Sequence, residues 1–313
     1  MREPRAPRPE LWAVLAYVTS VLFLALLVYL GLRPGGEGPV IAYGAGRQLI
    51  GLLAILDLFI GVAWSLLRRP VLQRRRALPF LLLVGVIGVI AFPIPYPSSH
   101  EGHESAVCFR LPFEGEWTVF WGGETKEESL LAGYFPDRRW GLDFVVSDAG
   151  LSHRGEGFEA SDYLCFGREV LAPADGKVVR AQDGAPDARP GTYDSRVEAC
   201  GNYVVIQVAE REFVFLCHLG RGSIAVKPGQ AVRAGEPIGR VGTSGFSTVT
   251  PEPHLAIHLQ DTPEPGRGEA VPWSFCDYVA AGIRVERGLP RGGIGPGGRL
   301  RGERVQPVTD VRR

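Results

Sequence analysis

Three of the six histidines of this chain, His218, His254 and His258, lie in short apolar runs that are typical of β-strands. His254, Ala256 and His258 occupy alternate positions of one run, so their side chains face the same side of a strand. Imidazoles can bind a metal ion or transfer a proton near neutral pH. We therefore expect any metal or catalytic site to lie here. The absence of a histidine at position 256, where Ala256 stands, matters most for this expectation.

The elements that must position these histidines form a compact β domain. Alternating or β-branched runs at residues 117–121, 203–208 and 213–219 predict strands, and Gly and Pro separate them. Two further short strands are predicted within residues 170–179, joined by a turn at Asp175-Gly176. Residues 182–200 are polar and predict a surface excursion between strands.

The composition sets few limits on partners. The chain has 34 basic and 34 acidic residues, so its net charge of zero indicates no particular partner. Its five cysteines all follow the apolar N-terminal region, and disulfides are allowed if that part lies outside the cell. Two interpretations stay open: a Cys165–Cys200 disulfide, because each cysteine precedes a strand, or buried free thiols.

The first 97 residues predict a membrane region with three transmembrane helices. Residues 11–32, 48–67 and 77–94 are apolar runs long enough to cross a bilayer, and prolines follow the third. The alternative is buried core helices, which three such runs in succession disfavour. A cleaved signal peptide fits poorly, because no short apolar segment with a small-residue cleavage site appears.

Arginines around these runs predict the orientation. They are dense at the N-terminus and between the second and third runs, and sparse after the first. Because arginine-rich segments stay inside, we expect a cytoplasmic N-terminus and an extracytoplasmic C-terminal domain. Asp57 lies within the second run, where a charge is costly and often functional. Without an ionisable partner, we expect it to bond to a neighbouring helix or a Ser or Thr hydroxyl, or to be protonated.

Two polar segments flank the β domain, which is predicted to span residues 111–283. Residues 98–110 predict a solvated linker, whose His100 and His103 lack metal-binding spacing. Residues 284–313 contain eight arginines against three acids, a net charge of 8 − 3 = +5, and predict a Gly/Arg-rich tail. This tail could be attracted to anionic wall polymers or lipid headgroups, whereas nucleic acid is not expected outside the cell.

The order of motifs resembles the lysostaphin-like (LytM-type) zinc endopeptidases of bacterial cell walls. The matching pieces are Gly141-x-Asp143-Phe144, Val170-x-Ala172-x-x-Asp175-Gly176-x-Val178, Gly201-Asn202-Tyr203-Val204-Val205-Ile206, His218-Leu219, Val226-x-x-Gly229-x-x-Val232-x-x-Gly235-x-x-Ile238-Gly239-x-x-Gly242-x-Ser244-Gly245 and Pro253-His254-Leu255. The resemblance covers about residues 111–275. It implies a mostly antiparallel β domain of the duplicated hybrid motif type, with a groove in which zinc activates a water to cut peptidoglycan cross-link peptides.

The resemblance also assigns residues to roles. Asp143 stands at a retained zinc-ligand position, and His218 and His254 stand at the positions of two histidines that assist the chemistry. Two ligand positions depart from the family pattern, because Arg139 and Ala256 replace the expected histidines. The domain therefore resembles a degenerate member of the family.

The replacements remove the donors that zinc needs. Catalytic zinc takes three protein donors and keeps an open position for water. Alanine offers no donor, and arginine remains a cation. We expect no cofactor, with an Arg139–Asp143 ion pair organising the site; zinc is expected only if His258 joins Asp143 and His254 in a shifted site.

Two function classes follow. In the first, a membrane-tethered pseudoenzyme in the bacterial cytoplasmic membrane binds a peptidoglycan peptide or regulates a wall hydrolase. In the second, the chain is an active zinc endopeptidase with a rearranged metal site. A biotinyl or lipoyl carrier fold has similar Val-x-x-Gly spacing, but Lys126, Lys177 and Lys227 lack the surroundings of a modified lysine.

Overall fold

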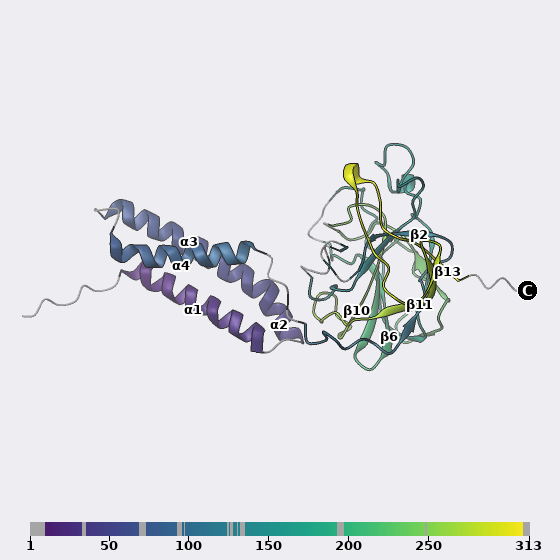
Figure 1. Ribbon diagram of the computed structural model, residues 1–313, viewed down its shortest axis with the longest axis horizontal. Helices are drawn as coiled ribbons and strands as arrows, with labels where there is room; N and C mark the ends of the chain where they lie inside the picture. Colours follow the sequence, from purple (N-terminus) through teal and green to yellow (C-terminus); the bar gives the residue numbers. More distant parts are fainter. Residues whose placement is uncertain are drawn as a thin grey trace, which may run out of the picture. The chain divides into compact units, whose positions relative to one another are not determined.

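The computed structural model shows a chain of two compact units, Met1–Pro97 and Ser98–Arg313 (Figure 1). The structure describes residues 10–32, 36–68, 73–92, 96, 98–123, 125, 128, 129, 131, 135–192, 197–247 and 249–308.

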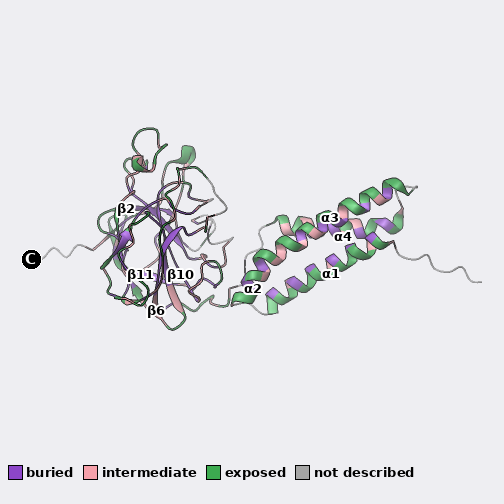
Figure 2. Ribbon diagram, turned by 180° about the vertical axis from the view of Figure 1, so that it is seen from behind, coloured by how far each residue is buried: buried purple, intermediate pink, exposed green. Residues whose placement is uncertain are grey.

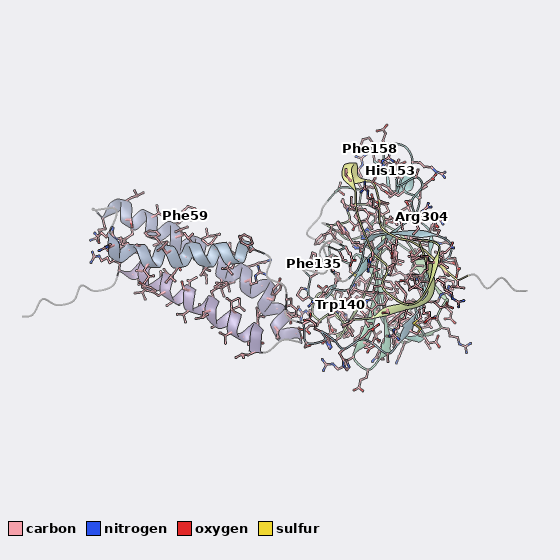
Figure 3. The ribbon with its side chains drawn as sticks, viewed as in Figure 1. Phe59, Phe135, Trp140, His153, Phe158 and Arg304 are labelled. Atoms are coloured by element: carbon pink, nitrogen blue, oxygen red, sulfur yellow. A yellow bond between two sulfur atoms is a disulfide. The ribbon has the colours of Figure 1, made fainter. Side chains whose placement is uncertain are left out.

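The first unit is helical. Its elements are α1 (Leu11–Leu32), α2 (Glu37–Ile41), the π-helical turn η1 (Ala42–Gly46), α3 (Arg47–Leu67) and α4 (Arg74–Ala91). Small residues allow close packing. The ring of Trp12 lies so close to Gly61 that a Cβ on this glycine would come within 2.7 Å of the ring. The outer faces expose large apolar side chains such as Phe59, which is 70% exposed (Figures 2 and 3).

Two of the described helical stretches, Leu11–Leu32 and Glu37–Leu67, are long and apolar enough to cross a membrane. The third predicted span corresponds to α4, which forms a helix but does not pass the same test. Three arginines occupy its first turn and its apolar part is correspondingly short. The structure also differs from the prediction in the first loop, because α2 and η1 extend the helix that was expected to begin near residue 48.

Two buried polar side chains of the helical unit, Asp57 and Arg76, have partners on other segments. Asp57 accepts a hydrogen bond of 2.6 Å from the hydroxyl of Thr19 on α1, and both residues are buried. Asp57 therefore has the kind of hydroxyl partner that the sequence suggested. Nearer the helix ends, the buried guanidinium of Arg76 donates to both carboxylate oxygens of Glu10, at 3.0 and 2.9 Å.

The second unit is mostly β and contains one large curled sheet. Its strands are β1 (Cys108–Phe109), β2 (Trp117–Trp121), β3 (Leu142–Val145), β4 (Glu169–Leu171), β5 (Gly176–Gln182), β6 (Asn202–Ala209), β7 (Glu212–Leu219), β8 (Ala231–Val232), β9 (Pro237–Arg240), β10 (Leu255–Gln260), β11 (Ser274–Ala280), β12 (Ile283–Gly288) and β13 (Arg304–Pro307). The strand order is β1-β11-β13-β2-β3-β10-β7-β6-β5-β8, with β12 beside β11, and β4 and β9 form a separate pair. All pairs except β1–β11 are antiparallel.

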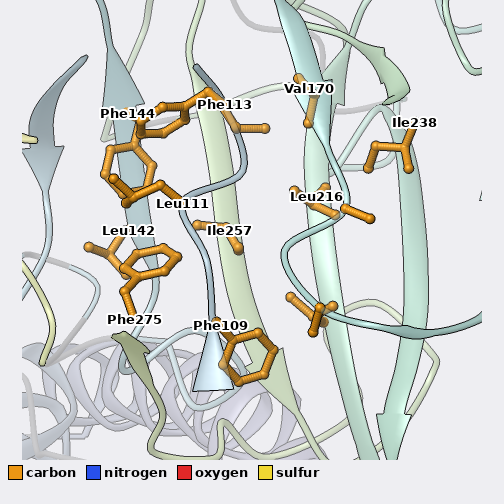
Figure 4. Packing of buried hydrophobic residues seen from close by; sticks show 14 of the residues in the cluster. Phe109, Leu111, Phe113, Leu142, Phe144, Val170, Leu216, Ile238, Ile257 and Phe275 are labelled. Atoms are coloured by element: carbon orange, nitrogen blue, oxygen red, sulfur yellow. The ribbon is translucent and has the colours of Figure 1, made fainter. Parts of the chain in front are cut away.

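Alternation along the central strands separates two faces. On one face, Leu142, Phe144, Leu216 and Ile257 join the main hydrophobic core, part of which Figure 4 shows. The residues between them point to the opposite face, which carries Asp143, Ala256 and His258 and which we call the site face.

Two predicted polar segments are built into this unit, contrary to expectation. The predicted linker contains β1, which pairs with β11, and the amide of Ser105 donates to the carbonyl of Pro272. The predicted tail contributes β12 and β13, and β13 lies between β11 and β2. The compositional argument failed because short strands such as β1, β12 and β13 are held by backbone pairing with neighbouring strands, which residue composition does not reveal.

The cysteines pair differently from the prediction. Disulfides join Cys108 to Cys276 and Cys200 to Cys217, whereas Cys165 is a buried free thiol. The Cys165–Cys200 prediction is therefore wrong, and the alternative of a buried thiol holds for Cys165. Position before a strand is a poor guide to pairing, since a disulfide requires Cα atoms about 4.4–6.8 Å apart.

Candidate functional site

Three adjacent strands place Asp143, Ala256 and Cys217 side by side on the site face. In the antiparallel register, Ala256 on β10 lies opposite Asp143 on β3 and opposite Cys217 on β7. Cys217 is bonded to Cys200. Together with Ala256, these half-cystines belong to one buried apolar cluster, completed by Tyr203, Val205 and Phe215. The space beside Asp143 on the sheet is therefore filled by a methyl group and a disulfide.

Asp143 is buried and accepts a hydrogen bond of 2.5 Å from the hydroxyl of Thr250. Burial raises the pKa of the Asp143 carboxyl, because water no longer solvates its charge. The hydrogen bond from Thr250, followed by the nearby His218 and Arg138, acts in the opposite direction without reversing the shift. Sequence reasoning missed Thr250, which lies outside the recognised motifs.

His218 and His254 lie together next to Asp143. Their ring centroids are 4.4 Å apart, and Nε2 of His254 is 3.9 Å from Oδ2 of Asp143. Nδ1 of His218 donates to the carbonyl of Ser244 at 2.9 Å, and Nδ1 of His254 donates to that of Glu252 at 2.6 Å. A carbonyl can only accept, so Nδ1 carries the proton in each neutral ring and Nε2 keeps its lone pair.

Burial keeps both imidazoles neutral. It lowers the pKa of His218 to about 3 and that of His254 to about 4. The approach of His254 to Asp143 is therefore not an ion pair near neutral pH. His218 has φ of 63°, a strained value for a non-glycine residue, and lies where the β6–β7 register shifts. This bulge turns its ring toward His254.

A small cavity of about 20 Å³ opens beside the two histidines, and we call it the His254 cavity. Its walls include His218, His254, Ser247, Thr250 and Glu252. This volume suits about one water molecule. Nε2 of His254 is buried and has no hydrogen-bond partner in the described part of the chain, so an acceptor is available at this cavity.

Arg138, and not Arg139, is the arginine whose charge acts on the site. The predicted Arg139–Asp143 ion pair does not appear: Arg139 donates to Glu101 at 3.2 Å and its guanidinium lies 5.0 Å from the ring centroid of Trp140. The positive charge of Arg138, in contrast, contributes to lowering the pKa of Asp143 and of all three strand histidines.

His258 lies apart from the other two histidines. Its ring stacks on Phe215, with centroids 4.7 Å apart and planes inclined by 12°, and burial lowers its pKa to about 3. It lines a second cavity with Asp137, Arg138 and Glu198, which we call the His258 cavity. It does not share a cavity with His254, although both face the same side of the sheet.

The donors around Asp143 do not fit a three-donor zinc site. Ala256 has no lone pair, and the sulfur of Cys217 is committed to a disulfide. Among the residues that the structure describes, no group of three or more His, Cys, Asp or Glu is arranged to hold a metal ion. The retained positions thus comprise one carboxylate and two imidazoles whose arrangement differs from a metal centre.

A carboxylate and two buried imidazoles thus gather on one side of a curled, mostly antiparallel sheet. Residues 152–268 match Peptidase family M23, and the chain carries an M23 domain of the LytM/lysostaphin-like kind there. The matched range contains His218, His254 and Ala256, whereas Asp143 precedes it.

Several solved structures are similar to this chain. The catalytic domain of a mutant of the prophage-encoded M23 protein EnpA from Enterococcus faecalis is 21% identical, with a TM-score of 0.33, and the match covers 52% of this chain and 94% of that one. A zinc-containing peptidase from Vibrio cholerae is 21% identical, with a TM-score of 0.32 and coverages of 52% and 39%. The lysostaphin catalytic domain from Staphylococcus simulans is 18% identical, with a TM-score of 0.29 and coverages of 50% and 88%. No curated protein matches the chain.

Proposed function

We propose that this chain is a membrane-anchored M23 domain that binds peptidoglycan peptides, or a hydrolase that acts on them, without cutting a peptide bond itself. Membership of the M23 family implies a peptidoglycan-related function. The observation that carries the proposal is the position of Ala256, directly opposite Asp143 and packed with the Cys200–Cys217 disulfide. A metal would have to enter an apolar cluster that offers it no third donor.

The site face still suits recognition of a peptide. The lone pair on Nε2 of His254 can accept a hydrogen bond from a water in the His254 cavity, and this water can bridge to a backbone amide of the ligand. The walls of the His254 cavity also contain the hydroxyl groups of Ser247 and Thr250. Thr250 stabilises Asp143 without a metal, because its hydroxyl satisfies a buried carboxyl oxygen that would otherwise be costly. The site face therefore offers polar groups for binding a peptide, although its donors do not suit zinc.

The anchoring that we propose uses three transmembrane helices, α1, α2–α3 and α4. The outward-facing apolar side chains support it, because a large exposed apolar surface needs a lipid or protein partner. Arginines at the N-terminus and before α4 favour a cytoplasmic N-terminus. The two disulfides in the second unit favour an extracytoplasmic location for it, as disulfides persist outside the reducing cytoplasm.

Metal analysis tests the loss of zinc. We expect the detergent-solubilised chain, dialysed against zinc buffer, to retain far less than one zinc per molecule. Stoichiometric zinc that disappears in both Asp143→Ala and His254→Ala would contradict the proposal.

A pull-down with intact peptidoglycan sacculi tests the ligand. We expect the chain to sediment with sacculi and His254→Ala to sediment less, whereas His100→Gln, on a loop away from the His254 cavity, is the matched control. No retention of the wild-type chain would eliminate a wall ligand and leave a hydrolase as the partner. Enhanced wall degradation when the chain is added to a wall amidase would then identify that role.

A reporter active only outside the cytoplasm tests the orientation. Fused after residue 308, it should be active, and an inactive reporter in a stably produced fusion would reverse the proposed topology.

The second candidate is an active zinc endopeptidase with a rearranged site. Its support is the 3.9 Å approach of Nε2 of His254 to Asp143, with the buried nitrogen lacking a hydrogen-bond partner among the described residues. His258 would have to leave its stacking partner Phe215 to join them. Turnover of a cross-link peptide that a chelator abolishes, and that His258→Phe also abolishes, would favour this candidate.

A further inference from the structure

The His258 cavity, on the same sheet face as Asp143, has a volume of about 130 Å³. Its walls include Asp137, Arg138, Glu198, Cys200, His258 and Gly266. It approaches the size of an engineered protein cavity of about 150 Å³ that holds benzene, so one small organic molecule fits. It shares no wall residue with the His254 cavity.

Two buried polar atoms at this cavity lack hydrogen-bond partners among the described residues. Nε2 of His258 is one, and the residue is only 3% exposed. Nε of Arg138 is the other; it lies 3.4 Å from a carboxylate oxygen of Asp137, close enough for an ion pair but without the geometry of a hydrogen bond. Buried polar groups are almost always satisfied, so two such atoms around one hollow suit a polar ligand.

The charges around the cavity are of both signs. Arg138 supplies a guanidinium that can donate to a carboxylate, and Asp137 and Glu198 supply carboxylates that can accept from an ammonium group. A purely anionic ligand would meet two acids, and a purely cationic ligand would meet the arginine. A molecule with both charges close together satisfies both sides.

We propose that the His258 cavity binds a small free α-amino acid as its zwitterion. Its carboxylate accepts hydrogen bonds from Arg138 and from Nε2–H of His258, and its ammonium donates to Asp137 and Glu198. Stacking on Phe215 fixes the His258 ring, and the buried Cys200–Cys217 disulfide adjoins the cavity, so the site is largely pre-formed. The site is separate from the proposed peptide-binding site, because none of its walls is Asp143, His218 or His254.

Equilibrium dialysis of the solubilised full chain with radiolabelled alanine tests this site. We expect saturable 1:1 binding of radiolabelled alanine. Unlabelled alanine should displace the label at concentrations at least about tenfold lower than propionate or ethylamine, each of which lacks one of the two charges. Arg138→Gln should weaken alanine binding by about tenfold or more, the usual effect of losing a charge-assisted hydrogen bond. Arg139→Gln, an adjacent arginine that contacts Glu101, should leave the affinity unchanged.

His258→Phe is the second variant, because it keeps an aromatic ring on Phe215 and removes Nε2. Its melting temperature reports whether it folds, and we expect weaker alanine binding from the folded variant. The proposal is overturned if wild-type chain shows no saturable alanine binding at millimolar concentrations. It is also overturned if propionate or ethylamine competes as well as alanine, or if Arg138→Gln binds alanine normally. None of these outcomes changes the zinc or sacculus measurements.

Discussion

Ala256 and Cys217 lie opposite each other on β10 and β7, and the disulfide from Cys217 to Cys200 covers the alanine methyl. Asp143 is the neighbour of Ala256 on the other side. The position next to the Asp143 carboxylate is thus part of an apolar cluster. A metal-binding side chain introduced at position 256 would therefore have to displace packed apolar groups.

Ala256→His should destabilise the second unit and still not bind zinc stoichiometrically. An imidazole forced into this packed cluster should lower the free energy of unfolding by about 1–3 kcal/mol. Ala231→His at an exposed position of β8 is the control, and we expect a change within about 0.5 kcal/mol. Denaturant titration and metal analysis provide the measurements. An Ala256→His protein of unchanged stability that holds one zinc would contradict the packing argument.

Removing the Cys108–Cys276 disulfide should cost more stability than removing Cys200–Cys217. The two cysteines lie 168 residues apart in the sequence in the first bridge and 17 residues apart in the second. In the chain-entropy model, these loops correspond to about 5 and 3 kcal/mol, respectively. Paired Cys→Ser variants compared by thermal melting test the order. The reverse order would indicate that packing around the Cys200–Cys217 disulfide outweighs loop entropy.

The second unit should lose stability in mild acid. His218, His254 and His258 have pKa values of about 3, 4 and 3 in the folded chain, against 6.5 as the reference value. The unfolded chain thus binds more protons, and stability present above pH 6.5 is lost as the pH falls toward the folded values. At pH 5 each histidine should lower the free energy of unfolding by about 2 kcal/mol relative to its value at high pH. Between pH 4 and 6, His258→Gln should reduce the slope of the free energy of unfolding against pH by about one third. An unchanged slope would show that the titration of these histidines does not cause the loss of stability.

The contribution of the His100–Asp261 contact to stability should have the opposite pH dependence, since it is present in mild acid and lost at higher pH. Nε2 of His100 lies 3.4 Å from a carboxylate oxygen of Asp261, and this interaction raises the pKa of His100. A raised pKa means that the folded chain holds the proton more tightly. The stabilisation is complete below pH 6.5 and disappears as the pH rises through the folded value. His100→Gln should therefore lower the melting temperature at about pH 6 more than at about pH 9; equal effects would show that packing, not charge, matters at this contact.

Thr19 and Asp57 should be energetically coupled. Thr19→Val leaves a buried carboxyl group without its 2.6 Å hydrogen bond and should destabilise the helical unit by about 1–2 kcal/mol. Asp57→Leu combined with Thr19→Val should cost less than the sum of the single changes, because no polar group is then left unsatisfied. Denaturation of the wild type, the single variants and the double variant in detergent micelles measures this coupling free energy. Strict additivity would mean that the hydrogen bond contributes nothing.

Hydrophobic periodicity predicted much of the fold. The strands around His218 and His254 and the long apolar helices follow patterns of adjacent residues, which a sequence displays directly. Pairing between distant segments was not predictable in this way. The strands at residues 169–171 and 176–182 were expected from their turn, but β4 pairs with β9 and β5 with β6 and β8.

The candidate site was predictable only where a motif names the residue. Asp143, His218 and His254 were found by resemblance, and the structure brings them together. Thr250 and Arg138 were missed because hydroxyls and arginines are common and only three-dimensional proximity distinguishes them. Arg139 was the expected cation, yet it contacts Glu101, since adjacent residues in an irregular segment point in different directions. The Cys200–Cys217 disulfide was likewise hidden, although it decides what occupies the space beside Ala256.

The position of β13 has a consequence for how this protein is made. Since Arg304–Pro307 lies between β11 and β2, the strands on either side remain apart until residue 307 has left the ribosome. The nascent sheet must therefore remain incomplete until this segment emerges, with two open edges available to chaperones or to unwanted partners.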